Sequence, residues 1–385
     1  MPEQPPRLVS LDVFRGLTIA AMVLVNNPGS WSHIYWPLEH AEWNGWTPTD
    51  LIFPFFLFIV GVAIPLAFGK RIERGDARKS LFLKVVYRSV IIFLLGEFLA
   101  GFPYFKLSTI RIPGVLQRIA VCYFLAGLIY LVTRPRTIAI IAVALLIIYH
   151  LIMTRGHAPG TYVGDLSKEG SLASYIDRTV FGPHVWRQAV VYDPEGILST
   201  MGALATTLLG VLTGYLIGDK QKTPIEKVSA MFVAGFACII VGWCWNPWFP
   251  INKALWTSSF VFFTGGLALE FLALCYWLID IKGYKSYWTK PFVIFGVNAI
   301  VLFVGTGVMA ILMGKSSGFM GKFNSLLHIT KPDGSPQAIQ PFIYNHLFES
   351  WLSPNNASLA FAISFILLWL FLMWLLYRKN IIIKI

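Results

Sequence analysis

The chain has 385 residues, of which 56% are hydrophobic and only 13% are charged, and its mean hydropathy is +0.65. These values lie far outside the range of soluble domains and indicate a polytopic membrane protein. The net charge of +12 does not indicate a nucleic-acid partner. Lys and Arg fall in short clusters between apolar runs, which is the pattern of loops at the cytoplasmic face of a membrane.

Apolar runs of about 20 residues, the length needed to cross a bilayer, recur along the whole chain. They predict an all-α, polytopic transmembrane bundle of about ten helices that forms a single integral-membrane domain over residues 1–385. The predicted helices span residues 8–27, 48–69, 81–101, 113–133, 136–153, 197–218, 228–246, 255–280, 290–313 and 356–377.

The basic residues predict the orientation of this bundle. An even number of crossings places both termini on one side, and clusters such as the one from Lys70 to Arg88 predict that this side is the cytoplasm. Long loops at about residues 28–47, 154–196 and 314–355 then face outward. The polar N-terminus and the charged first apolar run, which carries Asp12 and Arg15, indicate a retained first helix without a cleaved signal peptide.

The most informative polar stretch is HAEWNGWTPTD, from His40 to Asp50, between two apolar runs at the expected outer face. Ionisable groups at such positions are costly and indicate a working site. Histidine titrates near neutral pH, so His40 is predicted to act as a general base or to accept an acyl group itself. Asn26, at the outer end of the first helix, is predicted to donate an amide hydrogen bond to a developing oxyanion.

Asp50 has two interpretations that are compatible with each other. The TPTD sequence is typical of a helix start, with Thr47 as N-cap, proline at the first helical position and an acid in the first turn. Alternatively, Asp50 orients or charges His40 and takes part in substrate binding. Nearby His33, Glu39 and Glu42 do not match a metal-ligand spacing, and the four cysteines form no CxxC pair, so neither a metal site nor a disulfide is expected.

Further polar residues in apolar surroundings each have a structural and a functional interpretation. Arg15 either neutralises Asp12 or meets a phosphate that enters from the cytoplasm. Gln117 and Arg118 lie about one turn inside the fourth helix, where they either line a cofactor pocket or pair with another helix. The candidates for substrate binding, each also explained by helix dipoles or helix bridging, are Glu195, Asn252, Lys253 and Asn298.

Five segments resemble the bacterial relatives of the heparan-α-glucosaminide N-acetyltransferase family of membrane acyltransferases. They are Arg7–Asn27, His40–Gly61, Arg111–Phe124, Asp193–Gly210 and Ile251–Val261. The pair HAEWNG and TPTDLIFP is the most specific of these motifs because it is rich in rare residues. In that family acetyl-CoA from the cytoplasm is the acyl donor, and the acceptor is the amino group of a terminal glucosamine on the far side.

The resemblance implies that His40 is the active-site histidine and Asn26 the helix-end asparagine, in a multi-pass protein of the bacterial inner membrane with His40 outside. The expected partners are acetyl-CoA, a small sugar or glycan acceptor and the lipid bilayer; the sequence allows a homodimer without indicating one. An amino-sugar permease is the alternative, although the chain shows no internal repeat. A purely structural scaffold would leave the clustering of Asn26, His40 and Asp50 unexplained.

Overall fold

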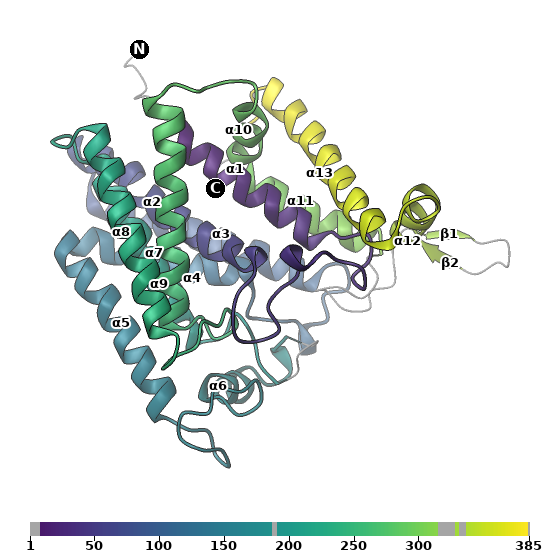
Figure 1. Ribbon diagram of the computed structural model, residues 1–385, viewed down its shortest axis with the longest axis horizontal. Helices are drawn as coiled ribbons and strands as arrows, with labels where there is room; N and C mark the ends of the chain where they lie inside the picture. The colour runs from purple at the N-terminus through teal and green to yellow at the C-terminus, as the bar shows by residue number, and fades with distance from the viewer. Residues whose placement is uncertain (1–7, 187–190, 315–327, 331–335, 384–385) are drawn as a thin grey trace. The chain divides into compact units, whose positions relative to one another are not determined.

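The computed structural model describes residues 8–186, 191–314, 328–330 and 336–383, and these residues are mainly helical (Figure 1). The first α-helices are α1 (Val9–Asn26), α2 (Ile52–Glu73), α3 (Arg78–Gly101), α4 (Val115–Val132), α5 (Pro135–Arg155) and α6 (Leu172–Phe181). The later ones are α7 (Ser199–Gly218), α8 (Pro224–Trp245), α9 (Ser258–Cys275), α10 (Thr289–Val297), α11 (Ala299–Leu312), α12 (Ile339–Tyr344) and α13 (Pro354–Arg378).

Short elements connect these helices. The 3-10 turns are η1 (Trp36–Leu38), η2 (Pro48–Leu51), η3 (Leu107–Thr109) and η4 (Gly182–His184), and the π-helical turns are η5 (Tyr276–Ile281) and η6 (Asn345–Glu349). The described residues contain one antiparallel pair of strands, β1 (His328–Thr330) and β2 (Pro336–Ala338). Parts of the expected outer loop 314–355, residues 315–327 and 331–335, lie outside the described residues.

The all-α polytopic bundle predicted from the sequence is confirmed. Among the described residues, eight helices are long and apolar enough to cross a membrane, namely α1, α2 with η2, α4, α5, α7, α8, α9 with η5, and α13. The predicted span 290–313 is broken, because α10 and α11 meet at Asn298 with a bend of 81°. The predicted helix 81–101 is α3, which is 24 residues long but carries several charged residues, including Arg88 and Glu97.

The chain divides into two compact units. The first comprises Met1–His40, Thr47–Ile52 and Lys285–Lys384, and the second comprises Ala41–Trp46 and Phe53–Tyr284. The chain therefore passes between the units within the HAEWNGWTPTD motif itself.

In the first unit, α1 packs against α10 and also contacts α11 and α13 (Figure 1). Glycines allow the close approach of α1 and α10. A Cβ atom added at Gly16 would lie 1.8 Å from the backbone oxygen of Phe292, and one added at Gly296 would lie 2.3 Å from that of Asp12. Small residues commonly permit such backbone contact between membrane helices.

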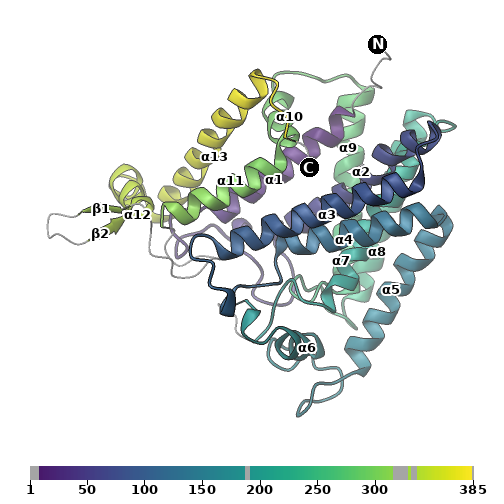
Figure 2. The ribbon, with the colours of Figure 1, turned by 180° about the vertical axis from the view of Figure 1, so that it is seen from behind.

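In the second unit, α3 pairs with α4 and α8 pairs with α9 (Figure 2). Helix α7 contacts α4, α5 and α9, and most of its side chains are buried. It is rich in Gly, Ala and Thr. Thr206 and Thr207 are fully buried, and their hydroxyls donate hydrogen bonds to backbone carbonyls one turn earlier in the helix. The N-terminal end of α7 follows the described segments 156–186 and 191–198, which carry Asp177, Asp193 and Glu195.

Candidate active site

The start of α2 is fixed by the TPTD sequence, as predicted. Pro48 begins the 3-10 turn η2, and the backbone N–H of Thr47 donates to Asp50 Oδ2 at 3.0 Å. The hydroxyls of the two threonines fasten the preceding loop, because Thr47 donates to the carbonyl of Glu39 at 2.5 Å and Thr49 donates to that of Pro37 at 3.0 Å. The loop that carries His40 is therefore anchored to a rigid helix start.

His40 and Asp50 form a direct pair in this structure. His40 Nδ1 lies 2.7 Å from Asp50 Oδ1, the Asp50 side chain is 1% exposed, and the His40 side chain is 53% exposed. An ionised carboxylate only accepts hydrogen bonds, so Nδ1 carries the donated hydrogen and Nε2 is the nitrogen that can take up a proton. Asp50 thus serves both as the helix-start acid and as the group that orients the imidazole.

Asn26 is the last residue of α1, and its side chain is exposed. Its amide makes no hydrogen bond with any described residue. The next residue, Asn27, has a structural role, because it is buried and its Nδ2 donates to the carbonyl of Val23 at 2.8 Å. Asn26 can therefore offer its amide to a ligand, and its part in catalysis stays a prediction.

A second polar cluster lies in the other unit and is centred on Arg111. Its Nε donates to Asp193 Oδ2 at 3.0 Å, and its Nη2 donates to Asp193 Oδ1 at 2.6 Å and to Glu195 Oε2 at 2.5 Å. Asp193 also accepts the backbone N–H groups of Trp186 and Glu195. Glu195 stays a prediction as an amine-binding residue, but its carboxylate already bonds to Arg111.

Asp177 of α6 lies beside this cluster and is only 2% exposed. Its Oδ1 accepts the backbone N–H of Ile197 at 2.8 Å. The pKa of Asp177 is raised to about 7, mainly by burial and also by nearby Asp193, although the Ile197 hydrogen bond and two arginines oppose this shift. Neither Asp177 nor Arg111 was predicted from the sequence as a site residue, because nothing along the chain indicates which loop charges meet.

Gln117 and Arg118 are buried at the start of α4 but bind different neighbours. Gln117 Nε2 donates to Glu97 Oε1 at 3.1 Å. Arg118 Nη2 donates to the carbonyl of Gly196 at 3.0 Å and to the hydroxyl of Ser199. Gln117 is therefore bonded to an acid, whereas Arg118 is bonded to none of the described carboxylates, and the ligand-binding roles of both residues stay predictions.

Two of the predicted substrate-binding residues have their side chains engaged in holding turns. Asn252 is fully buried; its Oδ1 accepts the N–H of Leu255 at 2.8 Å, and its Nδ2 donates to Asn44 Oδ1 at 3.1 Å. Asn298 lies at the break between α10 and α11, where it donates to the carbonyl of Ile381 and accepts the N–H of Ile383. Both roles explain these residues without a ligand, and their binding roles stay predictions.

The remaining predicted residues are placed as follows. Arg15 lies 3.4 Å from Asp12 Oδ1 and donates to the carbonyl of Gly296 at 3.3 Å, so its neutralising role is present. Lys253 follows Asn252 and is half-buried. The structure thus brings His40 together with Asp50, whereas Arg15 and Arg118 belong to different units.

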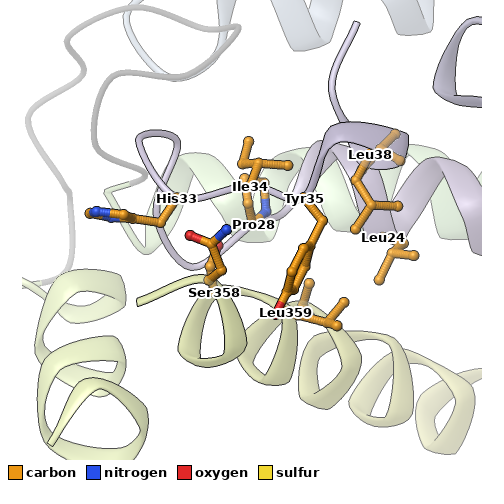
Figure 3. Close-up of a pocket in the computed structure, with 11 residues that line it drawn as sticks. Leu24, Pro28, His33, Ile34, Tyr35, Leu38, Ser358 and Leu359 are labelled. Atoms are coloured by element: carbon orange, nitrogen blue, oxygen red, sulfur yellow. The ribbon is translucent and has the colours of Figure 1, made fainter. Parts of the chain in front are cut away.

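A pocket in the first unit lies where the loop after α1 meets the start of α13 (Figure 3). It is a small, partly open pocket lined mainly by apolar side chains, among them Leu24, Pro28 and Leu359. His33 and Tyr35 also line it, and the Tyr35 hydroxyl donates to Asn356 Oδ1 at 2.6 Å. None of the residues predicted from the sequence as site residues lines this pocket.

The raised pKa of Asp177 leads to a prediction about stability. The folded protein keeps a proton on Asp177 up to about pH 7, whereas the unfolded chain releases it near the ordinary value of 3.8. The free energy of unfolding therefore falls as pH rises from about 4 to about 7. The amide in Asp177→Asn cannot titrate. Between pH 5 and pH 7 the free energy of unfolding of wild type should therefore fall by about 2 kcal/mol more than that of this variant.

Thermal unfolding in detergent, measured from pH 5 to pH 8, checks this expectation. The melting temperature of wild type should fall by a few degrees more than that of Asp177→Asn. Asp76→Asn, which replaces an exposed acid, is the control and should follow wild type. Parallel curves for wild type and Asp177→Asn would contradict the raised pKa.

The chain is similar in sequence to known proteins. Residues 7–167 match a family model described as heparan-alpha-glucosaminide N-acetyltransferase, catalytic. The human protein named heparan-alpha-glucosaminide N-acetyltransferase is 31% identical over 359 residues, which cover 78% of this chain and 53% of that protein. The mouse protein of the same name is 30% identical over 357 residues, which cover 79% of this chain and 54% of that protein. The chain spans about half the length of these relatives.

Proposed function

Because this chain is a homologue of heparan-alpha-glucosaminide N-acetyltransferase, we propose that it is a transmembrane acyltransferase. It moves an acetyl group from cytoplasmic acetyl-CoA to the amino group of a terminal glucosamine, or a related amino sugar, on the outer face. The observation that supports this proposal most directly is the His40–Asp50 pair, in which a buried carboxylate orients an exposed imidazole.

The proposed setting is the inner membrane of a bacterium, with both termini in the cytoplasm and the whole chain acting as one domain. The clustered basic residues support this orientation, which puts His40 on the outer side. Since the thioester donor is made in the cytoplasm, its acyl end must reach across the bilayer through the helices. Arg15, near the inner end of α1, is the proposed contact for a donor phosphate.

In the proposed step, the nitrogen of the acceptor amine attacks the thioester carbonyl, and His40 Nε2 takes up the proton that the amine loses. The carbon–sulfur bond then breaks, and the thiolate of CoA takes up a proton as it leaves. Asp50 holds Nδ1 and stabilises the imidazolium that forms. The amide of Asn26 donates to the oxyanion of the tetrahedral intermediate.

The rival step begins with attack of His40 Nε2 on the thioester, which gives an acetyl-imidazole that the amine then attacks. Mass spectrometry of the protein after mixing with acetyl-CoA, without acceptor, separates the two routes. An added acetyl group on the peptide that carries His40 would favour the covalent route. Its absence under rapid quenching would favour the general-base route.

The proposed function predicts that the purified protein, given acetyl-CoA and glucosamine, forms N-acetylglucosamine. Mass spectrometry of the sugar detects this product directly. In sealed vesicles the product should form only when acetyl-CoA is on the side of the termini and the sugar is on the opposite side. A protein that binds acetyl-CoA but acetylates no member of a panel of amino sugars and hydroxyl acceptors would overturn the proposal.

One observation favours a second candidate, an amino-sugar permease. The 81° break between α10 and α11 resembles the interrupted helices at which many transporters bind substrate. The carboxamide of Asn298 at this break is, however, already bonded to the backbone of Ile381 and Ile383. Uptake of amino sugar by sealed proteoliposomes that contain no acyl-CoA would favour the permease.

A further inference from the structure

Arg118 carries a buried charge that the described residues do not neutralise. It is 2% exposed, and its Nε and Nη1 atoms have no hydrogen-bond partner. The guanidinium stacks over the indole of Trp256, with its carbon 5.3 Å from the ring centre. Buried polar groups are nearly always satisfied, and a buried charge without a partner is costly, so this arrangement needs an explanation.

The nearby carboxylates do not supply the missing partner. Asp193 and Glu195 are both bonded to Arg111. Asp177 accepts the backbone N–H of Ile197, and because its pKa is raised to about 7 it is largely neutral below that pH. None of the described carboxylates lies within ion-pair distance of Arg118.

Two helix N-termini meet at the same place. Arg118 lies in the first turns of α4 and bonds to Ser199, the first residue of α7, and the two helices are in contact. Neither helix has a side-chain cap or an acidic residue in its first turn. The positive ends of both helix dipoles therefore add to the guanidinium charge, and such a place favours an anion.

We propose that Arg118 and the N-terminal turns of α4 and α7 form a binding site for an oxyanion of a substrate. This inference deepens the proposed acyl transfer and depends on it only for the identity of the substrates. Phosphate and carboxylate groups share the chemistry that would satisfy the remaining N–H bonds of Arg118. The oxyanion belongs either to the acceptor sugar or to the CoA donor.

The expected topology favours the acceptor. Three predicted crossings precede α4 and place its start on the side opposite the N-terminus, which is the proposed outer face. Arg15, in the second turn of α1, is by the same reasoning at the inner face. The two arginines therefore have different proposed roles, with Arg15 toward the donor phosphates and Arg118 toward an anionic acceptor.

Binding measured by thermal shift in detergent tests the site without requiring turnover. Two matched pairs of probes are used: glucosamine 6-phosphate with glucosamine, and CoA with pantetheine. Wild type should bind the anionic member of one pair at least about tenfold more tightly, and Arg118→Gln should lose that preference while it binds the neutral member as before. Arg178→Gln is the control, because the Arg178 guanidinium is bonded to the carbonyls of Val191 and Glu169.

Each outcome of this experiment decides the inference. A preference for glucosamine 6-phosphate that Arg118→Gln removes assigns the oxyanion to the acceptor, and a preference for CoA that it removes assigns it to the donor. If wild type prefers neither anionic probe, or if Arg118→Gln keeps the preference, the site is absent and Arg118 is structural. Should binding behave as expected while no sugar is acetylated, the proposed function fails and the anion site stands.

A second variant covers the case in which Arg118→Gln does not fold. Ser199→Ala removes the hydroxyl that accepts from Arg118 Nη2 and leaves the charge in place. It should weaken the same preference about threefold, since the guanidinium loses one of the groups that hold it. An unchanged preference in Ser199→Ala would then count against the site.

Discussion

Replacing His40 with Ala is expected to lower kcat/KM for acetyl transfer by about 10²- to 10⁴-fold, the usual contribution of a general base. The protein should fold normally, because the His40 side chain is 53% exposed. His33→Ala is a matched control, since His33 lies in the same loop and bonds to the Ser30 hydroxyl. A His40→Ala protein with full activity would exclude both the general-base and the covalent route.

Asp50→Asn tests whether the carboxylate acts through the imidazole. Asn keeps the shape of Asp50 but carries no charge to stabilise the imidazolium and no longer dictates which ring nitrogen bears the hydrogen. The rate should fall by about 10- to 100-fold. The acidic limb of the pH–rate profile should shift to lower pH, because the imidazole loses the nearby negative charge that favours its protonated form. An equal rate loss with an unmoved pH profile would indicate that Asp50 only stabilises the start of α2.

The helices could be predicted from the sequence because the length of an apolar run is read from consecutive residues and does not depend on long-range contacts. Nine of the ten predicted spans coincide with a continuous helical segment, including the one that begins at Pro48 with η2 and continues as α2, and the tenth coincides with the bent pair α10 and α11. The bend at Asn298 could not be predicted, because the residues around it are as apolar as those of an unbroken span. It depends on long-range bonds from Asn298 to residues 381 and 383.

The candidate site was predictable only in part. His40 and Asp50 are ten residues apart, and the helix start between them fixes their geometry, so the pair could be anticipated. Arg111 and Asp193 are 82 residues apart, and their pairing depends on how the long loop before α7 folds back. Likewise, the sequence alone cannot show that Arg118 is buried without a carboxylate partner. This depends on the pairing of the nearby Asp193 and Glu195 with Arg111.

The close crossing of α2 and α7 leads to the largest expected effect on stability. A Cβ atom added at Gly210 would lie 2.1 Å from the backbone oxygen of Phe58, and one added at Gly61 would lie 2.0 Å from that of Thr207. Both obstacles are backbone atoms of packed helices, which cannot rotate away as a side chain can. Gly210→Ala should therefore force the helices apart and reduce the stability of the fold by about 3 kcal/mol or more.

Gly218→Ala in the same helix is the matched control. Its added Cβ would meet only the side chain of Leu66, at 3.8 Å, an ordinary contact, so stability should change by less than about 1 kcal/mol. Thermal unfolding of both variants in one detergent, together with their yield of monodisperse protein, measures the difference. Because α7 carries Ser199 at its start, Gly210→Ala should also disturb the hydrogen bond between Ser199 and Arg118. Equal melting temperatures for the two variants would mean that α2 and α7 do not cross at these glycines.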